Sequence, residues 1–153
     1  MEGEAATRLT ELLDVGAAVV VATRSDDLVP HVTRGWGGRL DPTHSVLDLC
    51  LTVSDDLDVI ADLEANGAIA VTLAHPTSYR AMQVTGTAEW IGEVTSEDSA
   101  RVDAHIDRFL ALVVDIGLPP ETRRLAGDRF AAVRIRVEQA FEQTPGATAG
   151  SML

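Results

Sequence analysis

Six segments of this chain have the composition of β-strands, and most of them are joined by turns too short to hold a helix. The second segment is followed by the turn residues DPTH and then by a third apolar segment, so the two are expected to form an antiparallel hairpin. Parallel neighbours would need crossover connections of about a dozen residues or more. The sequence therefore predicts an antiparallel sheet built from residues 17–23, 29–40, 45–53, 67–75, 75–90 and 129–141.

Helical patterns lie before the first strand, after the third and after the fifth. Residues 1–15 carry a leucine stripe, and residues 95–117 carry apolar side chains at helical spacing behind a Thr-Ser-Glu-Asp start. Residues 54–67 begin with Ser54 as the expected N-cap and end at Gly67. Helices at only these places do not give the alternating order of a parallel sheet. The predicted fold class is mainly β (α+β), an antiparallel barrel with peripheral helices.

No linker or block of charge divides the 153 residues, and this length suffices for one domain with a sizeable core. We therefore expect a single domain over residues 1–153. It would begin with the helix at 1–15 and end with a tail at 144–153.

Two of the strands have patterns that predict which faces are buried. Residues 17–23 form a continuous apolar and β-branched run, which suits a strand buried on both faces. The fifth strand alternates instead, with Met82, Val84, Ala88 and Trp90 on one face and polar residues on the other. It is therefore expected to be half-buried.

The charge of the chain limits its partners. The formal net charge is -12, which repels polyanions and argues against nucleic acid or an anionic membrane surface. A small molecule or another protein is the expected partner. The N-terminal residues lack a basic region followed by an apolar core, and the longest apolar run, residues 15–22, is too short to span a bilayer. We therefore expect a cytoplasmic protein.

The sequence has no standard catalytic or metal-binding motif. Its four histidines, His31, His44, His75 and His105, include no pair at helical i, i+4 spacing, and its single cysteine, Cys50, excludes an internal disulfide. We expect Cys50 to be a small buried hydrophobic residue. Any catalysis would then depend on groups that the fold brings together.

Several residues are candidates for a binding site, each with a structural alternative. Arg34 and the glycine-rich residues after it lie in the second strand, where glycines mark either a bulge or the close approach of a ligand. Thr52 and Ser54 could receive an anion at a helix start, or Ser54 could be a plain N-cap. Arg80 is expected at the rim of the core, where it would pair with either a ligand phosphate or a structural carboxylate.

Taken together, these residues resemble a known family. The V-P-H-V-T start of the second strand, the helix followed by NGAIAVTL, and the run YRAMQVTGTAE occur in the same order as in the pyridoxamine phosphate oxidase-like, flavin-binding split-barrel proteins. The resemblance covers most of the chain, from the first strand to the last. It implies a six-stranded antiparallel Greek-key split barrel, a homodimer, and FMN held in a crevice shared by two subunits.

The resemblance also assigns roles to residues of this chain. The second strand of the family lines the flavin ring, and the segment after the third strand, with the start of the fifth, binds the phosphate. The cofactor-binding residues implied here are Thr33, Arg34, Gly35, Trp36, Thr52, Ser54 and Arg80.

The chain departs from the family pattern at three places. Asp55, Asp56 and Asp58 stand where the family commonly has a basic residue, so in a flavin-binding protein they should point to solvent. Ala81 replaces the glutamine that follows the arginine in the true oxidases. The C-terminal substrate-binding residues of those enzymes also have no counterpart, so oxidation of pyridoxamine phosphate itself is not expected.

Three functions fit the sequence. The first is an FMN-dependent oxidoreductase, in which the cofactor supplies the redox chemistry and no catalytic side chain is needed. The second uses a deazaflavin cofactor in the same crevice. The third is a non-catalytic or heme-binding split-barrel module, which the missing basic residues favour.

Overall fold

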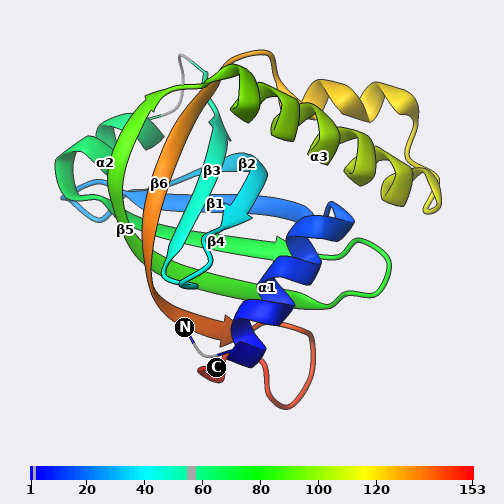
Figure 1. Ribbon diagram of the computed structural model, residues 1–153, viewed down its shortest axis with the longest axis horizontal. Coiled ribbons are helices and arrows are strands. Elements are labelled where there is room, and N and C mark those ends of the chain that lie inside the picture. Colours follow the sequence, from blue (N-terminus) through cyan, green and yellow to red (C-terminus); the bar gives the residue numbers. More distant parts are fainter. Residues whose placement is uncertain (2, 55–57) are drawn as a thin grey trace.

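The computed structural model describes residues 1, 3–54 and 58–153, and its six strands close into an antiparallel barrel (Figure 1). Around the barrel the strands follow the order β1-β2-β3-β6-β5-β4, and β4 pairs with β1 to close it. The pairings β3–β6 and β1–β4 join strands that are not consecutive, as in a Greek key. The predicted fold class is therefore confirmed. The strands are β1 Ala18–Arg24, β2 Pro30–Leu40, β3 Val46–Thr52, β4 Ala68–Ala74, β5 Ala81–Glu93 and β6 Phe130–Glu142.

Within the described residues, three α-helices and one 3₁₀ helix surround the barrel: α1 Gly3–Val15, α2 Val59–Asn66, α3 Ser96–Val114 and η1 Pro120–Ala126. In Figure 1, α1 and α2 lie on opposite sides of the barrel, α3 runs across the top, and the two chain ends lie close together. No helix within the described residues is both long enough and apolar enough to cross a membrane.

Apolar side chains form two cores. The larger core fills the barrel with inward-facing strand residues and is covered by the leucines of α1 and by Val59 and Leu63 of α2. The smaller core lies outside the barrel, where α3 covers β2, β3 and β6. Its buried members are Trp36, Cys50, Val102, Ile106, Phe109, Val113, Ala126 and Ala132. The expectation that Cys50 is a buried hydrophobic residue is confirmed.

A bulge in β2 lets α3 approach the barrel closely. The register between β2 and β3 shifts between Trp36 and Arg39, and Gly37 within this bulge has a φ of +61°. A Cβ on Gly37 would lie 2.9 Å from the backbone nitrogen of Val102 in α3. The glycines of this segment therefore form a bulge against which α3 packs. Of the two roles that the sequence allowed, a bulge or the close approach of a ligand, the structure shows the bulge.

His105 of α3 fastens this contact. Its Nδ1 accepts a hydrogen bond from the Gly37 backbone N–H (3.1 Å), so Nε2 carries the proton and donates to the carbonyl of Ala17 (2.9 Å). The side chain is buried, and burial lowers the pKa of His105 below its usual value despite the hydrogen bond to Ala17. The neutral ring therefore links α3 to both β2 and the start of β1.

Predicted helix ends are partly confirmed. Thr95 caps α3 in a capping box with Asp98, and Gly67 ends α2 with a φ of +70°. The predicted Ser54 N-cap is wrong: α2 begins at Val59 after Asp58, whose side chain makes no capping hydrogen bond. The buried face of the helix, which packs on the barrel, starts at Val59.

The predictions of which faces of β1 and β5 are buried also need correction. In β1 only alternate residues are buried and Val20 is 39% exposed, because no α-helix of the described part of the chain covers the outer face of this strand. In β5 the register shifts twice, once between Thr85 and Gly86 and once between Ala88 and Trp90. Trp90 is therefore turned away from the core and is 52% exposed, while Ile91 packs against the core instead.

Candidate functional site

Three of the seven predicted cofactor-binding residues line one hollow on the outside of the barrel. This hollow has a volume of about 300 Å³ and lies where β1, β2 and the end of β3 meet η1. We call it the Arg34 hollow, and its lining residues are Val20, Val32, Thr33, Arg34, Thr52 and Leu125.

The two threonines of the Arg34 hollow are held by hydrogen bonds within the protein. Thr33 Oγ1 donates to the carbonyl of Thr52 (2.7 Å). Thr52 Oγ1 accepts from the indole Nε1–H of Trp36 (2.9 Å) and donates to the carbonyl of Ala126 (2.7 Å). These bonds fix η1, and with it Leu125, against the barrel wall.

Among the residues that the structure describes, Arg34 is the only charged one that lines this hollow. Within residues 3–54 and 58–153, its guanidinium makes no hydrogen bond or ion pair. Arg80 differs, because its Nη2 lies 3.0 Å from Oε2 of Glu11 in α1 and both side chains are about half exposed. Of the two arginines that the sequence singled out, Arg34 is therefore the one whose charge is open to a ligand.

The other predicted residues lie apart from the Arg34 hollow. Trp36 is 2% exposed and packs edge-on against His105 and Phe109 beneath α3. Gly35 faces the barrel interior, where a Cβ would lie 2.8 Å from side-chain atoms of Leu49 and Val19.

Two more predicted features lie outside the hollow. Ser54 is partly exposed. Arg80 lies just before β5, and its partner is the carboxylate of Glu11, which is the structural alternative to a ligand phosphate. Asp58 points to solvent as predicted, since its side chain is 75% exposed. Asp55 and Asp56 lie outside the described residues.

A hydrogen-bonded pair that sequence reasoning missed joins β2 to α2. Oδ2 of Asp62 lies 2.7 Å from Nδ1 of His31 and accepts a hydrogen bond of 2.7 Å from Thr23. Asp62 is 3% exposed. Burial alone would raise the pKa of Asp62, but the hydrogen bonds from Thr23 and His31 outweigh burial and lower it. The carboxylate is therefore ionised, Nδ1 of His31 is the donor, and Nε2 faces outward toward Asp58 (3.6 Å).

One sequence signal could have identified this pair. Asp62 lies between Val59 and Leu63 on the buried face of α2, and an aspartate on an apolar helical face requires a polar partner. No group of three or more metal-ligating side chains gathers anywhere in the part of the chain that the structure describes.

Comparisons with known proteins find solved structures of similar fold. No family model and no curated protein matches the chain. Among solved structures, an F420 reductase has 21% identity and a TM-score of 0.55, over 85% of this chain and 93% of that one. A relative of general stress protein 26 in the pyridoxinephosphate oxidase family, from Clostridium acetobutylicum, has 13% identity and a TM-score of 0.55, over 99% and 97%. An FMN-binding protein from Syntrophomonas wolfei has 9% identity and a TM-score of 0.56, over 90% and 85%.

The chain has the pyridoxamine phosphate oxidase-like split-barrel fold. In this split barrel, the Arg34 hollow combines apolar side chains from β1, β2 and η1 with one open guanidinium. Apolar walls suit a planar ring, and a guanidinium suits a single carboxylate or phosphate group. The residues present therefore suit a planar ring that carries one anionic group.

Proposed function

We propose that this split-barrel protein binds FMN in the Arg34 hollow and is a flavin-dependent oxidoreductase of a small-molecule substrate other than pyridoxamine phosphate. The observation that carries the proposal is the unpaired Arg34 guanidinium beside the exposed side chains of Val20, Val32 and Leu125. The names of the structural neighbours, which include an FMN-binding protein and an F420 reductase, support a flavin-type cofactor.

In this proposal the side chains of the hollow bind and orient the cofactor. Bound flavin would supply the hydride or electron transfer. Arg34 would neutralise the phosphate through charge-assisted hydrogen bonds, and Val20 and Val32 would pack against the apolar ring. The Thr52 hydroxyl would act indirectly by holding η1, and Leu125 with it, in place.

The proposal extends to a homodimer. The outer faces of β1 and β2 border the hollow, and β4 pairs with β1 beside them. These faces carry small apolar side chains that no element within the described residues covers. A contiguous exposed apolar face of this kind commonly marks a protein interface. A second subunit packed there would enclose the cofactor. The outward-facing residues are Val20 and Val32, which are exposed, and Ala22, Ala68, Ala70 and Ala74, which are partly exposed.

Protein purified from cells should be yellow with the visible absorption of flavin, and calorimetric titration should measure its affinity for FMN. Arg34→Ala should weaken FMN binding by roughly tenfold or more, since a charge-assisted hydrogen bond contributes about 1.5–3 kcal/mol. Arg80→Ala is the matched control and should leave the affinity unchanged, because Arg80 pairs with Glu11. Asp58→Lys should also change it little, since Asp58 points to solvent.

Other outcomes would replace the proposal. A loss of affinity in Arg80→Ala but not in Arg34→Ala would move the phosphate to Arg80 and refute the Arg34 hollow as the site. A Soret band in the purified protein would indicate heme instead. Protein with neither absorption and no measurable affinity for FMN would favour the non-catalytic module.

The homodimer has its own test. Sedimentation equilibrium should give a dimer at micromolar concentration, and Ala22→Glu, which places a charge on the proposed interface, should give a monomer. A monomeric wild-type protein would contradict the interface.

A further inference from the structure

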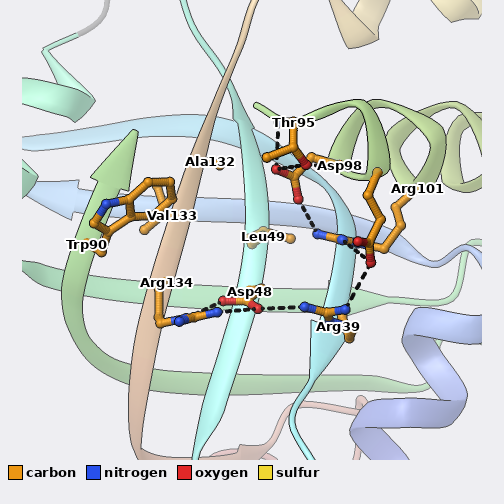
Figure 2. Close-up of a pocket in the computed structure, with 11 residues that line it drawn as sticks. Arg39, Asp48, Leu49, Trp90, Thr95, Asp98, Arg101, Ala132, Val133 and Arg134 are labelled. Carbon is orange, nitrogen blue, oxygen red and sulfur yellow. Dashed lines mark hydrogen bonds and ion pairs between the residues drawn. The ribbon is translucent and has the colours of Figure 1, made fainter. Parts of the chain in front are cut away.

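A second concave site, also on the outside of the barrel, shares no lining residue with the Arg34 hollow. This cleft has a volume of about 340 Å³ and lies between the outer face of β3 and β6 and the start of α3. Figure 2 shows Trp90 on one side of the cleft, the start of α3 on the other, and Asp48 between two arginines in the middle. We call it the Trp90 cleft, after the residues Trp90, Ala132, Arg134, Asp48, Arg39 and Arg101 that define it.

The position of the Trp90 ring depends on a glycine and a bulge. The register shift between Ala88 and Trp90 turns the side chain outward, and Gly92 leaves the space that the ring occupies. A Cβ on Gly92 would lie 2.2 Å from Cζ2 of the indole. The strand partner of Gly92 is Ala132, which is also small. The indole therefore lies along the strand with half of its area exposed, which makes a platform for stacking.

Guanidinium groups stand beside this platform. Arg134 is the strand partner of Trp90. The guanidinium of Arg134 donates two hydrogen bonds, of 2.8 and 3.0 Å, to the carboxylate of Asp48. Asp48 also accepts from Arg39 (3.2 Å). Arg134 and Arg39 remain about half exposed, so each keeps donors available to a ligand.

An exposed carboxylate of the protein lies beside two of the arginines of the cleft. Glu97 is 72% exposed, and its Oε1 lies 3.1 Å from Nη1 of Arg39 and 3.6 Å from Nη1 of Arg101. An exposed glutamate contributes little to stability in such a pair. Its carboxylate therefore marks a place that an anionic group of a ligand could take.

We propose that the Trp90 cleft binds a planar aromatic molecule that carries one carboxylate or phosphate group. The ring would stack on the indole of Trp90, and the anion would bind Arg134 and Arg39, displacing Glu97. Stacking on an exposed aromatic side chain is tolerant of the ring's identity, whereas guanidinium groups select carboxylate and phosphate. The site shares no lining residue with the Arg34 hollow, so it does not rest on flavin binding there.

The test is calorimetric titration of the full chain with naphthoate and with naphthyl phosphate, and with naphthalenemethanol as the uncharged control. We expect both anions to bind and the alcohol to bind more weakly, and the tighter of the two anions identifies the preferred group. Trp90→Ala should weaken binding by about fivefold or more, and Arg134→Ala by about tenfold or more. Gly92→Ala keeps the indole but displaces it, and should also weaken binding.

A matched control lies two residues along the same strand face. Arg136 is as exposed as Arg134 (53% in each case), but it pairs with Glu89 and does not line the cleft. Arg136→Ala should bind the anions as the wild-type protein does. Binding that survives unchanged in both Trp90→Ala and Arg134→Ala, or that falls equally in Arg136→Ala, would overturn the proposal. So would the absence of binding to the wild-type protein.

Discussion

Replacing Thr52 by valine tests whether this residue is chiefly a structural link. Valine has nearly the same shape but no hydroxyl, so the variant leaves the indole N–H of Trp36 without an acceptor and the carbonyl of Ala126 without its donor. Both partners are 2% exposed and cannot turn to water. The test separates the hydrogen bonds of Thr52 from its packing.

The expected cost follows from these two unsatisfied groups. Each buried donor or acceptor without a partner costs about 1–3 kcal/mol, so Thr52→Val should lower the free energy of unfolding by about 2–6 kcal/mol. For a domain of this size the melting temperature should fall by roughly 4–24 °C. Thr52→Ser keeps the hydroxyl and should lose less than about 1.5 kcal/mol.

Urea denaturation followed by circular dichroism measures the free energy of unfolding of each variant. If the slope of this free energy against urea concentration is unchanged, both variants unfold in the same way. Trp36→Phe should remove about half of the added cost of Thr52→Val in the double variant, because the indole donor is then gone while the carbonyl of Ala126 still lacks its donor. If Thr52→Val loses no more stability than Thr52→Ser, the reasoning is refuted.

Further predictions concern the contacts of α3. Because the folded protein holds His105 neutral and lowers its pKa, stability should be fully present above about pH 6.5 and should fall as the pH drops below it, since the unfolded chain then binds a proton that the folded state excludes. Chemical denaturation at several pH values measures this slope, and it should disappear in His105→Gln. Gly37→Ala should lose about 2–4 kcal/mol, because its φ is positive and the added Cβ would meet the backbone at Val102. Thr95→Ala removes the cap shared with Asp98 and should cost about 1 kcal/mol in urea denaturation; a cost near that of Gly37→Ala would mean that the capping box supports more than the helix end.

Much of the fold could be predicted because it depends on local signals. Alternation, short turns and glycines at positive φ are properties of neighbouring residues, so the six strands, the end of α2 at Gly67 and the start of α3 at Thr95 were all predictable. The exposure of Val20 was not, because it depends on which strand faces the helices cover. The outward turn of Trp90 depends on bulges that change the alternation part-way along β5.

The candidate site was predicted less well, since it depends on partners distant in sequence. The sequence alone does not distinguish Arg34 from Arg80. Only the position of Glu11 in α1 shows that Arg80 is paired and that Arg34 is open to a ligand. In the same way, the burial of Trp36 requires α3, which follows it by some sixty residues in the chain.

The place of β6 in the barrel has a consequence for how the protein assembles. β6 is the last strand along the chain, yet it lies between β3 and β5 and completes the ring. Until it forms, β3 and β5 each present a row of unpaired backbone groups, which can pair with another chain and aggregate. Its pairing with β3 joins Val46 to Arg136, a contact between distant parts of the sequence that is slow to form. During synthesis, most of the barrel strands therefore leave the ribosome before the ring can close, and this interval is when the nascent chain most needs a chaperone.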